Sequence, residues 1–403
     1  MTRPLIYCDY NAGAPVRSEA AAAVARALSL GGNPSSVHGA GRAAKALLEE
    51  ARERVGASVG ARAENVVFTS GATEALHLTL ACVGAKSAVI SAVEHDALYE
   101  HASRTRSDAR IAPVDADGVM DLVALEAILA DAPRPALVAV QFANNETGVI
   151  QPIARIAALA REHGALLLVD AAQGLGRIPV NIADLDAAYL VLSSYKIGGP
   201  PGAGALVLAP GAPFITTRFG GGQERGRRPG TENVAACAGF GVAAEIAART
   251  QASEATRLTA LRDRFEAGLP IDAVVFGAYR TAGVPAGGDV STLGGGTRRT
   301  TTAGEDAGGP RLPNTSNFAL PGIAAETAVI ALDLEGVAIS SGAACSSGKV
   351  RASRVLAAMG VDHDLAKSAL RVSFGWASTE ADVDAALAAV GKIAARRSLA
   401  GAA

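Results

Sequence analysis

A lysine, a carboxylate that precedes it and a cysteine that follows it are the residues of this chain best suited to chemistry. Lys196 lies in SSYKIGGPPG, Asp170 lies in LLLVDAAQG, and Cys345 lies in ISSGAACSSG. A lysine amine can hold the aldehyde of pyridoxal phosphate, and a carboxylate can keep the ring nitrogen of that cofactor protonated. A cysteine on a loop of small residues is an accessible nucleophile. Together the three residues indicate chemistry on the sulfur atom of an amino acid.

Each of the three also has a purely structural interpretation. Lys196 could be a surface lysine, Asp170 could cap a helix where a strand ends, and Cys345 could be a half-buried thiol. The gap of 26 residues between Asp170 and Lys196 allows one crossover and one further strand. Both side chains can therefore face the same crevice, which favours the chemical interpretation.

The segment SGATEA (70–75) is a candidate phosphate site. It follows the apolar run NVVFT and opens a predicted helix, whose first backbone N–H groups attract an anion. Gly71 lets the backbone approach a ligand closely, and the Thr73 and Ser193 hydroxyls can add hydrogen bonds. The alternative is an ordinary helix start, with Glu74 in the first turn.

Further polar residues follow other predicted strands. His95 in VEHDAL could stack on a flat ring or move a proton, although a lone histidine is also a common structural hydrogen-bonding group. Asn145 in NNETG could bond a ring or substrate oxygen, or simply favour a turn. Arg371 in LRVSFG suits a bidentate clamp on a carboxylate. Thr231 in RGRRPGTEN lies either in a solvated loop or beside the phosphate site of a partner subunit.

Composition excludes several classes of protein. Of the 403 residues, 49% are apolar and 19% are charged, which is enough to bury a large core. The net charge of −2 gives no sign of a nucleic-acid or membrane-surface partner. Four scattered cysteines without metal-ligand spacing predict no metal site and fit a reducing compartment. The first residues lack the apolar stretch of a signal peptide, so we expect a cytoplasmic protein.

Short apolar runs alternate with helical segments between residues 65 and 210, which predicts an α/β fold with a mostly parallel sheet between helices. The predicted strands span 65–70, 87–91, 136–142, 165–170, 187–194 and 203–209. We expect a large domain over 15–251, and a smaller α+β domain that combines 1–14 with 252–403 and carries the Cys345 loop. Residues 281–312 are rich in Gly and Thr and predict a flexible insertion.

The order and spacing of these blocks resemble the cysteine desulfurases of the NifS/IscS type, within the class V, fold-type I pyridoxal phosphate enzymes. The resemblance runs along most of the chain. Its blocks include YCDYNAGAP, GNPSSVHGAGR, FTSGATEA, VEHDAL, NNETGVIQPI, VDAAQ, SSYKIGGPPG, RRPGTEN, SGAACSSG and LRVSFG.

The resemblance implies a role for each matched residue. Lys196 would be the Schiff-base lysine, Asp170 the partner of the pyridinium nitrogen, and Cys345 the residue that forms a persulfide. The other expected contacts are with the cofactor ring (His95), its phenolic oxygen (Gln173 and Asn145), its phosphate (Ala72, Thr73, Ser193, Tyr195 and the partner subunit's Thr231) and the substrate (Asn33, Asn145 and Arg371).

Tyr195 departs from the family pattern, which usually has histidine before the lysine. A phenol donates one hydrogen bond and carries no charge, so weaker cofactor binding is expected.

The resemblance implies a homodimer that converts L-cysteine to L-alanine and passes the sulfur to an acceptor protein, such as an iron–sulfur scaffold. A selenocysteine lyase and a class V aminotransferase are alternatives on the same fold. A protein without catalysis that serves as an assembly scaffold is a third.

Overall fold

The computed structural model describes residues 5–277, 310–342 and 352–400. Cys345 and most of the predicted insertion at 281–312 lie outside the described residues. The last residues of that insertion are described. Arg311 forms an ion pair with Glu266 at 2.8 Å, and the Leu312 amide donates to the carbonyl of Gly148 at 2.7 Å.

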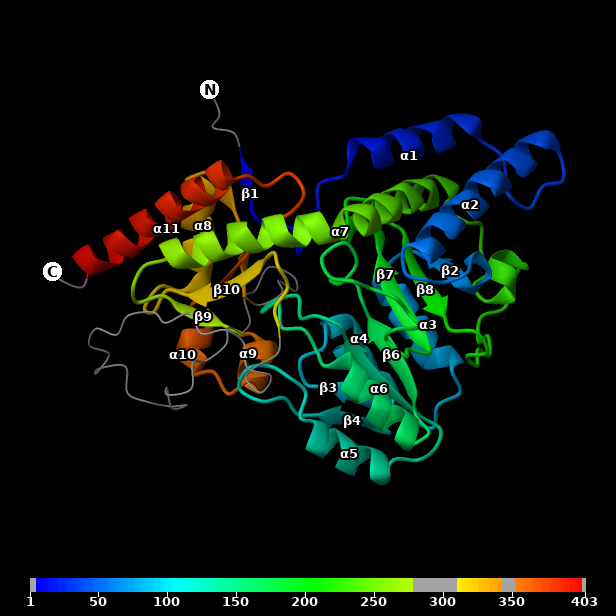
Figure 1. Cartoon of the computed structure of the whole chain (residues 1–403), viewed down its shortest axis with the longest axis horizontal. Helices are drawn as coiled ribbons and strands as arrows, with labels where there is room; N and C mark the ends of the chain where they lie inside the picture. The colour runs from blue at the N-terminus through cyan, green and yellow to red at the C-terminus, as the bar shows by residue number, and fades with distance from the viewer. Residues whose placement is uncertain (1–4, 278–309, 343–351, 401–403) are drawn as a thin grey trace.

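A seven-stranded sheet forms the centre of the larger lobe, in the order β2-β8-β7-β6-β5-β3-β4 (Figure 1). Strand β8 is antiparallel to both of its neighbours, and all other neighbouring pairs are parallel. The predicted mostly parallel sheet is therefore confirmed. The strands are β2 (Val66–Thr69), β3 (Ser87–Ser91), β4 (Ala109–Ala112), β5 (Ala136–Gln141), β6 (Leu166–Asp170), β7 (Tyr189–Ser193) and β8 (Gly204–Leu208).

Helices cover both faces of this sheet because neighbouring residues of a buried strand point to opposite sides. In β2, Val66 and Phe68 join one apolar core while Val67 joins the other. The first core packs against α1, α2, α5, α6 and α7, and the second packs against α3 and α4. The helices are α1 (Ser18–Leu30), α2 (Gly39–Ala57), α3 (Ala72–Cys82), α4 (Asp96–Thr105), α5 (Leu122–Ala130), α6 (Ile153–Glu162) and α7 (Val234–Gly268).

The smaller lobe contains an antiparallel sheet of order β12-β13-β10-β9 and the parallel pair β1-β11. Its core includes Phe265, whose ring contacts Phe318 and Phe374 edge-on. The strands are β1 (Ile6–Tyr7), β9 (Val274–Phe276), β10 (Thr315–Ala319), β11 (Val337–Ala338), β12 (Ser340–Ser341) and β13 (Ala369–Ser373). The helices are α8 (Ala325–Leu334), α9 (Arg354–Ala358), α10 (His363–Ala366) and α11 (Glu380–Ala400).

Helix α7 joins the two lobes, as Figure 1 shows. Its first half packs Phe240 into a core of the large sheet, and its second half packs Leu258 and Phe265 into the core of the smaller lobe. A single continuous helix therefore crosses residue 251, where the predicted domain boundary falls. The exact boundaries remain a proposal.

Candidate active site

The predicted chemical residues converge at the carboxyl ends of the parallel strands, where ligands bind in open α/β sheets. Asp170 ends β6, and Lys196 closes a short 3₁₀ turn after β7. Together they line a cavity of about 530 Å³. Its wall includes ten of the predicted site residues, namely Ala72, Thr73, His95, Asn145, Asp170, Gln173, Ser193, Tyr195, Lys196 and Arg371.

Lys196 carries the features of a reactive amine. Its Nζ donates to the carbonyl oxygens of Asn11 at 2.5 Å and Ala12 at 2.9 Å. Burial, together with the positive charges of Arg371 and Arg177, lowers the pKa of Lys196 to about 7. A lysine with this pKa supplies neutral amine near neutral pH, and neutral amine is the form that attacks a carbonyl.

Asp170 and His95 face Lys196 across the cavity. The Ala172 amide donates to Asp170 Oδ1 at 2.9 Å, and Asp170 is buried. Burial raises the pKa of this carboxyl, while that hydrogen bond and the charges of His95 and Lys196 act in the opposite direction. A buried carboxylate of this kind needs a cation, and a protonated ring nitrogen would supply one.

The His95 ring is neutral and has a defined tautomer. Its Nδ1 accepts a hydrogen bond from the Ala97 amide at 3.0 Å and caps α4, so the ring proton is on Nε2. The ring is exposed to solvent in the open cavity. Desolvation by the surrounding protein nevertheless lowers the pKa of His95. A neutral, flat ring on the cavity wall can stack on a heteroaromatic cofactor.

The start of α3 provides an anion site. Gly71 precedes the helix with no side-chain cap, and the Ser193 hydroxyl is buried without a partner among the described residues. Glu74 would repel an anion here, but Arg218 at 2.9 Å and Arg228 at 3.1 Å neutralise it. Orphaned N–H groups and an unpaired hydroxyl fit a phosphate. The residues present therefore fit pyridoxal phosphate.

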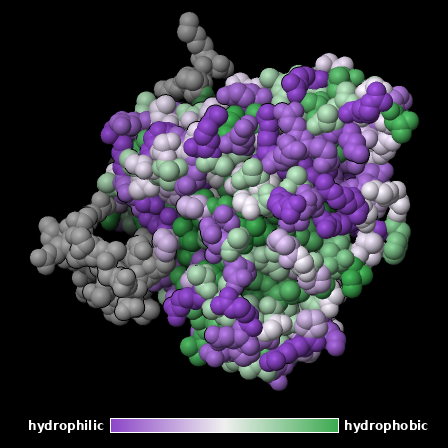
Figure 2. All heavy atoms as spheres, turned by 45° about the vertical axis from the view of Figure 1, so that its right-hand side comes forward, coloured by the Kyte–Doolittle hydropathy of each residue, from purple (hydrophilic) through white to green (hydrophobic). Residues whose placement is uncertain are grey.

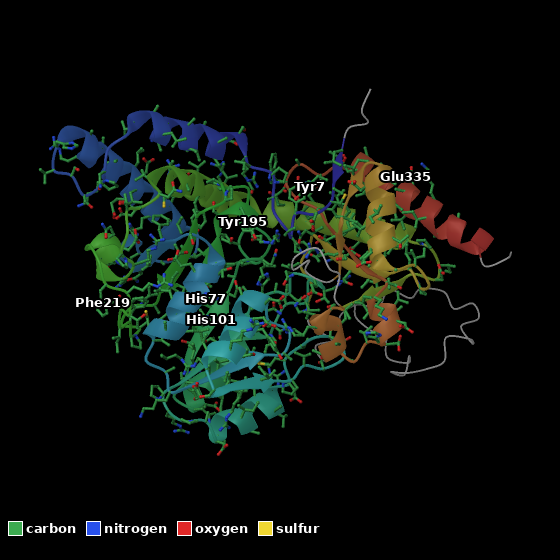
Figure 3. All side chains as sticks on the ribbon, turned by 180° about the vertical axis from the view of Figure 1, so that it is seen from behind. Tyr7, His77, His101, Tyr195, Phe219 and Glu335 are labelled. Carbon is green, nitrogen blue, oxygen red and sulfur yellow. The ribbon has the colours of Figure 1, made fainter. Side chains whose placement is uncertain are left out.

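Tyr195 stands beside this site in a space that Gly13 leaves open. A Cβ atom at position 13 would lie 3.2 Å from the Tyr195 ring. The Lys196 amine lies 4.6 Å from the centre of that ring. Burial and the charge of Asp170 raise the pKa of Tyr195, so the phenol stays a neutral donor. Tyr195 and Tyr7, labelled in Figure 3, lie near the junction of the two lobes.

Arg371 also lines the cavity, and its surroundings suit a carboxylate ligand. Its guanidinium donates to Asp9 Oδ1 at 2.7 Å and to the carbonyl of Asn145 at 3.1 Å. Its Nε is buried and has no partner in the part of the chain that the structure describes. A buried, unpaired guanidinium nitrogen marks a place for an acceptor from a ligand.

Two predicted residues do not line the cavity. Asn33 is exposed, and its Oδ1 accepts from the Ser35 amide at 2.9 Å in a local turn. Thr231 is also exposed, on the segment between β8 and α7. Their assignment to the substrate and to a partner's phosphate site remains a prediction.

The structure adds residues that sequence reasoning missed. Asn11 offers its carbonyl to Lys196, Asp9 pairs with Arg371, and Arg177 contacts Gln173. Asp9 and Asn11 lie inside YCDYNAGAP, so the motif was noticed but its polar residues were not assigned. Arg177 carried one weak signal, a basic residue four positions after Gln173 in the same turn.

The chain belongs to the aminotransferase class-V family, which it matches over residues 6–269 and 299–386. Its relatives include proteins named cysteine desulfurase. The cysteine desulfurase IscS of Dictyoglomus turgidum is 34% identical over 94% of this chain and 92% of the relative. A cysteine desulfurase of Rhodobacter capsulatus is 37% identical over 98% of this chain and 97% of the relative.

A solved structure has the same fold. The NifS-like protein of Rickettsia africae superposes with a TM-score of 0.83 at 30% identity, and covers 96% of this chain and 99% of its own. The predicted fold class and family are therefore confirmed.

The described residues contain no group of three or more His, Cys, Asp and Glu side chains that could hold a metal ion. None of their helices has the length and apolarity needed to cross a membrane.

Proposed function

We propose that this protein is a pyridoxal phosphate-dependent cysteine desulfurase that converts L-cysteine to L-alanine and retains the sulfur as a persulfide on Cys345. The observation that carries the proposal is the juxtaposition of a half-buried lysine of lowered pKa, Lys196, with the buried carboxylate of Asp170 in one cavity. Membership of a family with relatives named cysteine desulfurase supports the substrate.

The cofactor, when bound, supplies an aldehyde that condenses with amines and a ring that accepts electrons from the substrate α-carbon. Asp170 would hold the ring nitrogen and His95 would stack on the ring. The amides of Gln173 and Asn145 would lie near its phenolic oxygen. The α3 N-terminus would hold the phosphate, with Ala72, Thr73, Ser193, Tyr195 and the partner subunit's Thr231.

The other residues act on the substrate. Arg371 binds the α-carboxylate and thereby orients the α-carbon toward Lys196, with Asn33 and Asn145 as further contacts. With the substrate in place, the Lys196 amine would remove the α-proton as a general base and later return a proton to carbon. A pKa of about 7 suits both directions of this transfer at neutral pH.

The sulfur step requires no external oxidant or reductant. The Cys345 thiolate attacks the sulfur of the substrate, so an S–S bond forms as the C–S bond breaks. The electron pair of the C–S bond stays on carbon, which takes up a proton and leaves as the methyl group of L-alanine. The persulfide is then passed to an acceptor protein, such as an iron–sulfur scaffold. We also propose a cytoplasmic homodimer, in which each Thr231 serves the partner's site.

A single-turnover experiment tests this function. Cofactor-loaded protein would be mixed with L-cysteine without reductant, alkylated and examined by peptide mass spectrometry. We expect one additional sulfur atom on the Cys345 peptide, and none in Cys345→Ser. Persulfide at another cysteine, or at none, would contradict the assignment.

A further inference from the structure

Arg177 is a fully buried cation that the reaction described above does not use. It lies in the turn after β6, where its guanidinium donates to the main-chain carbonyls of Tyr10 at 3.3 Å and Lys196 at 3.4 Å. It also donates to the main-chain carbonyl of Gln173 at 3.0 Å and to the Gln173 side-chain oxygen Oε1. Arg177 therefore joins three segments that meet at the cavity.

The charge of Arg177 is solvated but not neutralised. All four acceptors are neutral oxygens, and no carboxylate in the described ranges forms an ion pair with Arg177. Burial and repulsion from Arg371 lower the pKa of Arg177 to about 9, so it stays charged at neutral pH. Burying a charge without a counter-charge destabilises the folded protein. Because its burial is unfavourable, we expect the charge of Arg177 to have a function.

The contact with Gln173 fixes the direction of a side-chain amide. Because Arg177 occupies Oε1, the amide cannot turn this oxygen toward the cavity without losing a charge-assisted hydrogen bond. The Gln173 Nε2 consequently lies on the side of Asn11, to whose carbonyl it donates at 3.0 Å. The same carbonyl accepts from Lys196. Nε2 carries a second hydrogen, for which no further partner is found among the described residues.

We infer that Arg177 is a positioning residue that locks Gln173 with its N–H groups toward the cavity and adds an uncompensated positive charge behind Lys196. This inference rests on the proposed function, because its target is the phenolic oxygen of the bound cofactor. A donor and a nearby cation both favour the deprotonated oxygen over its protonated form. They would therefore lower the pKa of the proton that the phenolic oxygen of the bound cofactor shares with the Lys196 nitrogen.

The test is a pH titration of the visible absorption of cofactor-loaded protein, which needs no turnover. In Arg177→Met the midpoint should rise by about one pH unit or more, the usual effect of removing a charge at close range. In Arg177→Lys, which keeps the charge and one donor, most of the shift should be recovered. In Gln173→Ala the midpoint should also rise, and the double variant should shift by less than the sum of the two, as expected for groups that act together.

Arg17 provides the matched control. Its Nε donates to the Ile197 carbonyl at 3.2 Å and its guanidinium lies over the Trp376 ring, but it makes no hydrogen bond to Gln173. The midpoint of Arg17→Met should stay at the wild-type value. An unchanged midpoint in Arg177→Met, or equal shifts in Arg17→Met and Arg177→Met, would overturn the inference.

The remaining outcomes are also decisive. If Arg177→Met does not fold, the neutral variant Arg177→Gln takes its place: a wild-type midpoint in Arg177→Gln would overturn the inference, and a raised midpoint would support it. A wild-type protein that binds no pyridoxal phosphate would contradict the proposed function itself, and the inference with it. That result differs from the case in which the cofactor binds but the titration midpoint does not change when Arg177 is replaced.

Discussion

At the scale of single residues, several ionisable groups of the site have no bonded partner of opposite charge. Among the described residues, the half-buried Lys196 amine and the buried Arg177 guanidinium have no carboxylate bonded to them, and Asp170 is a buried carboxylate without a bonded cation. Such groups are costly in an empty site and are stabilised when a ligand of matching charge arrives. In the proposed function, the cofactor and the substrate carboxylate would supply those charges.

The lowered pKa of Lys196 predicts how the cofactor-free protein responds to pH. Between about 7 and the ordinary value of 10.5, the unfolded chain holds a proton on Lys196 that the native protein does not. Native stability therefore rises with pH across this window. Lys196→Met has no such proton, so we expect it to be more stable than the wild type at pH 6, with a difference that shrinks as the pH rises. Urea unfolding at several pH values measures this.

Lys392→Met is the control for this experiment. Lys392 is half exposed and pairs with Glu335 at 2.7 Å on the surface. Its replacement should leave the pH dependence unchanged. A stability difference between wild type and Lys196→Met that does not vary with pH would show that the lysine is not buried as described.

Arg371 predicts a loss of substrate affinity. Arg371→Ala removes the guanidinium and leaves Asp9 unpaired beside the incoming carboxylate. The KM for L-cysteine should rise about tenfold or more, the usual effect of losing a hydrogen bond between charged groups. Cysteamine lacks the carboxylate, so its binding, followed by the visible spectrum, should change little. An equal loss for both ligands would place the carboxylate elsewhere.

The sequence predicted which residues would gather in one cavity where a motif follows a strand, as for Lys196, Asp170 and His95. It did not predict the contacts between distant segments. The Asn11 carbonyl is 185 residues from Lys196, and Asp9 is 362 residues from Arg371. No local pattern encodes such pairs, because they depend on where the N-terminal segment packs in the folded chain.

At the scale of elements, the phosphate site depends on a close approach of two backbones. A Cβ on Gly204 of β8 would lie 2.6 Å from the carbonyl carbon of Gly71, directly before α3. Contacts this short cannot form without displacement. A glycine in a strand interior often marks such an approach.

Gly204→Ala should therefore weaken phosphate binding in particular. The variant must push Gly71 and the first turn of α3 away, at a cost of about 1–3 kcal/mol in unfolding free energy. Equilibrium dialysis should show a larger loss of affinity for pyridoxal phosphate than for pyridoxal, which lacks the phosphate. Gly391→Ala in α11, where no atom lies within 4 Å of the added carbon, is the control. Equal losses of affinity for both ligands would show that Gly71 does not contribute to phosphate binding.

Element prediction from the sequence succeeded where burial is continuous. The interior strands β5 and β7 are wholly buried and their apolar runs are clear. The edge strand β4 was missed because Arg110 and the exposed Ile111 interrupt its apolar pattern. Helices α1 and α2 were missed because their buried faces consist largely of alanine and glycine, which give a weak apolar stripe.

At the scale of the whole molecule, the cavity draws on both lobes. Arg371 comes from β13 in the smaller lobe, while Lys196 and Asp170 come from the large sheet. The distribution of hydrophilic and hydrophobic residues on the surface in Figure 2 does not single out a site for a partner. Figure 2 shows hydrophilic and hydrophobic residues interspersed over the face it presents. The exposed Phe219, labelled in Figure 3, lies away from the lobe junction on the segment that also carries Thr231.

Removal of sulfur from L-cysteine at this cavity is tested by assaying L-alanine and sulfide together, with cofactor-loaded protein, L-cysteine and a thiol reductant but no keto acid. We predict equal amounts of both products, at many turnovers per chain, and neither in Lys196→Ala. No alanine without a keto acid, together with amino transfer when one is added, would identify an aminotransferase and contradict the account.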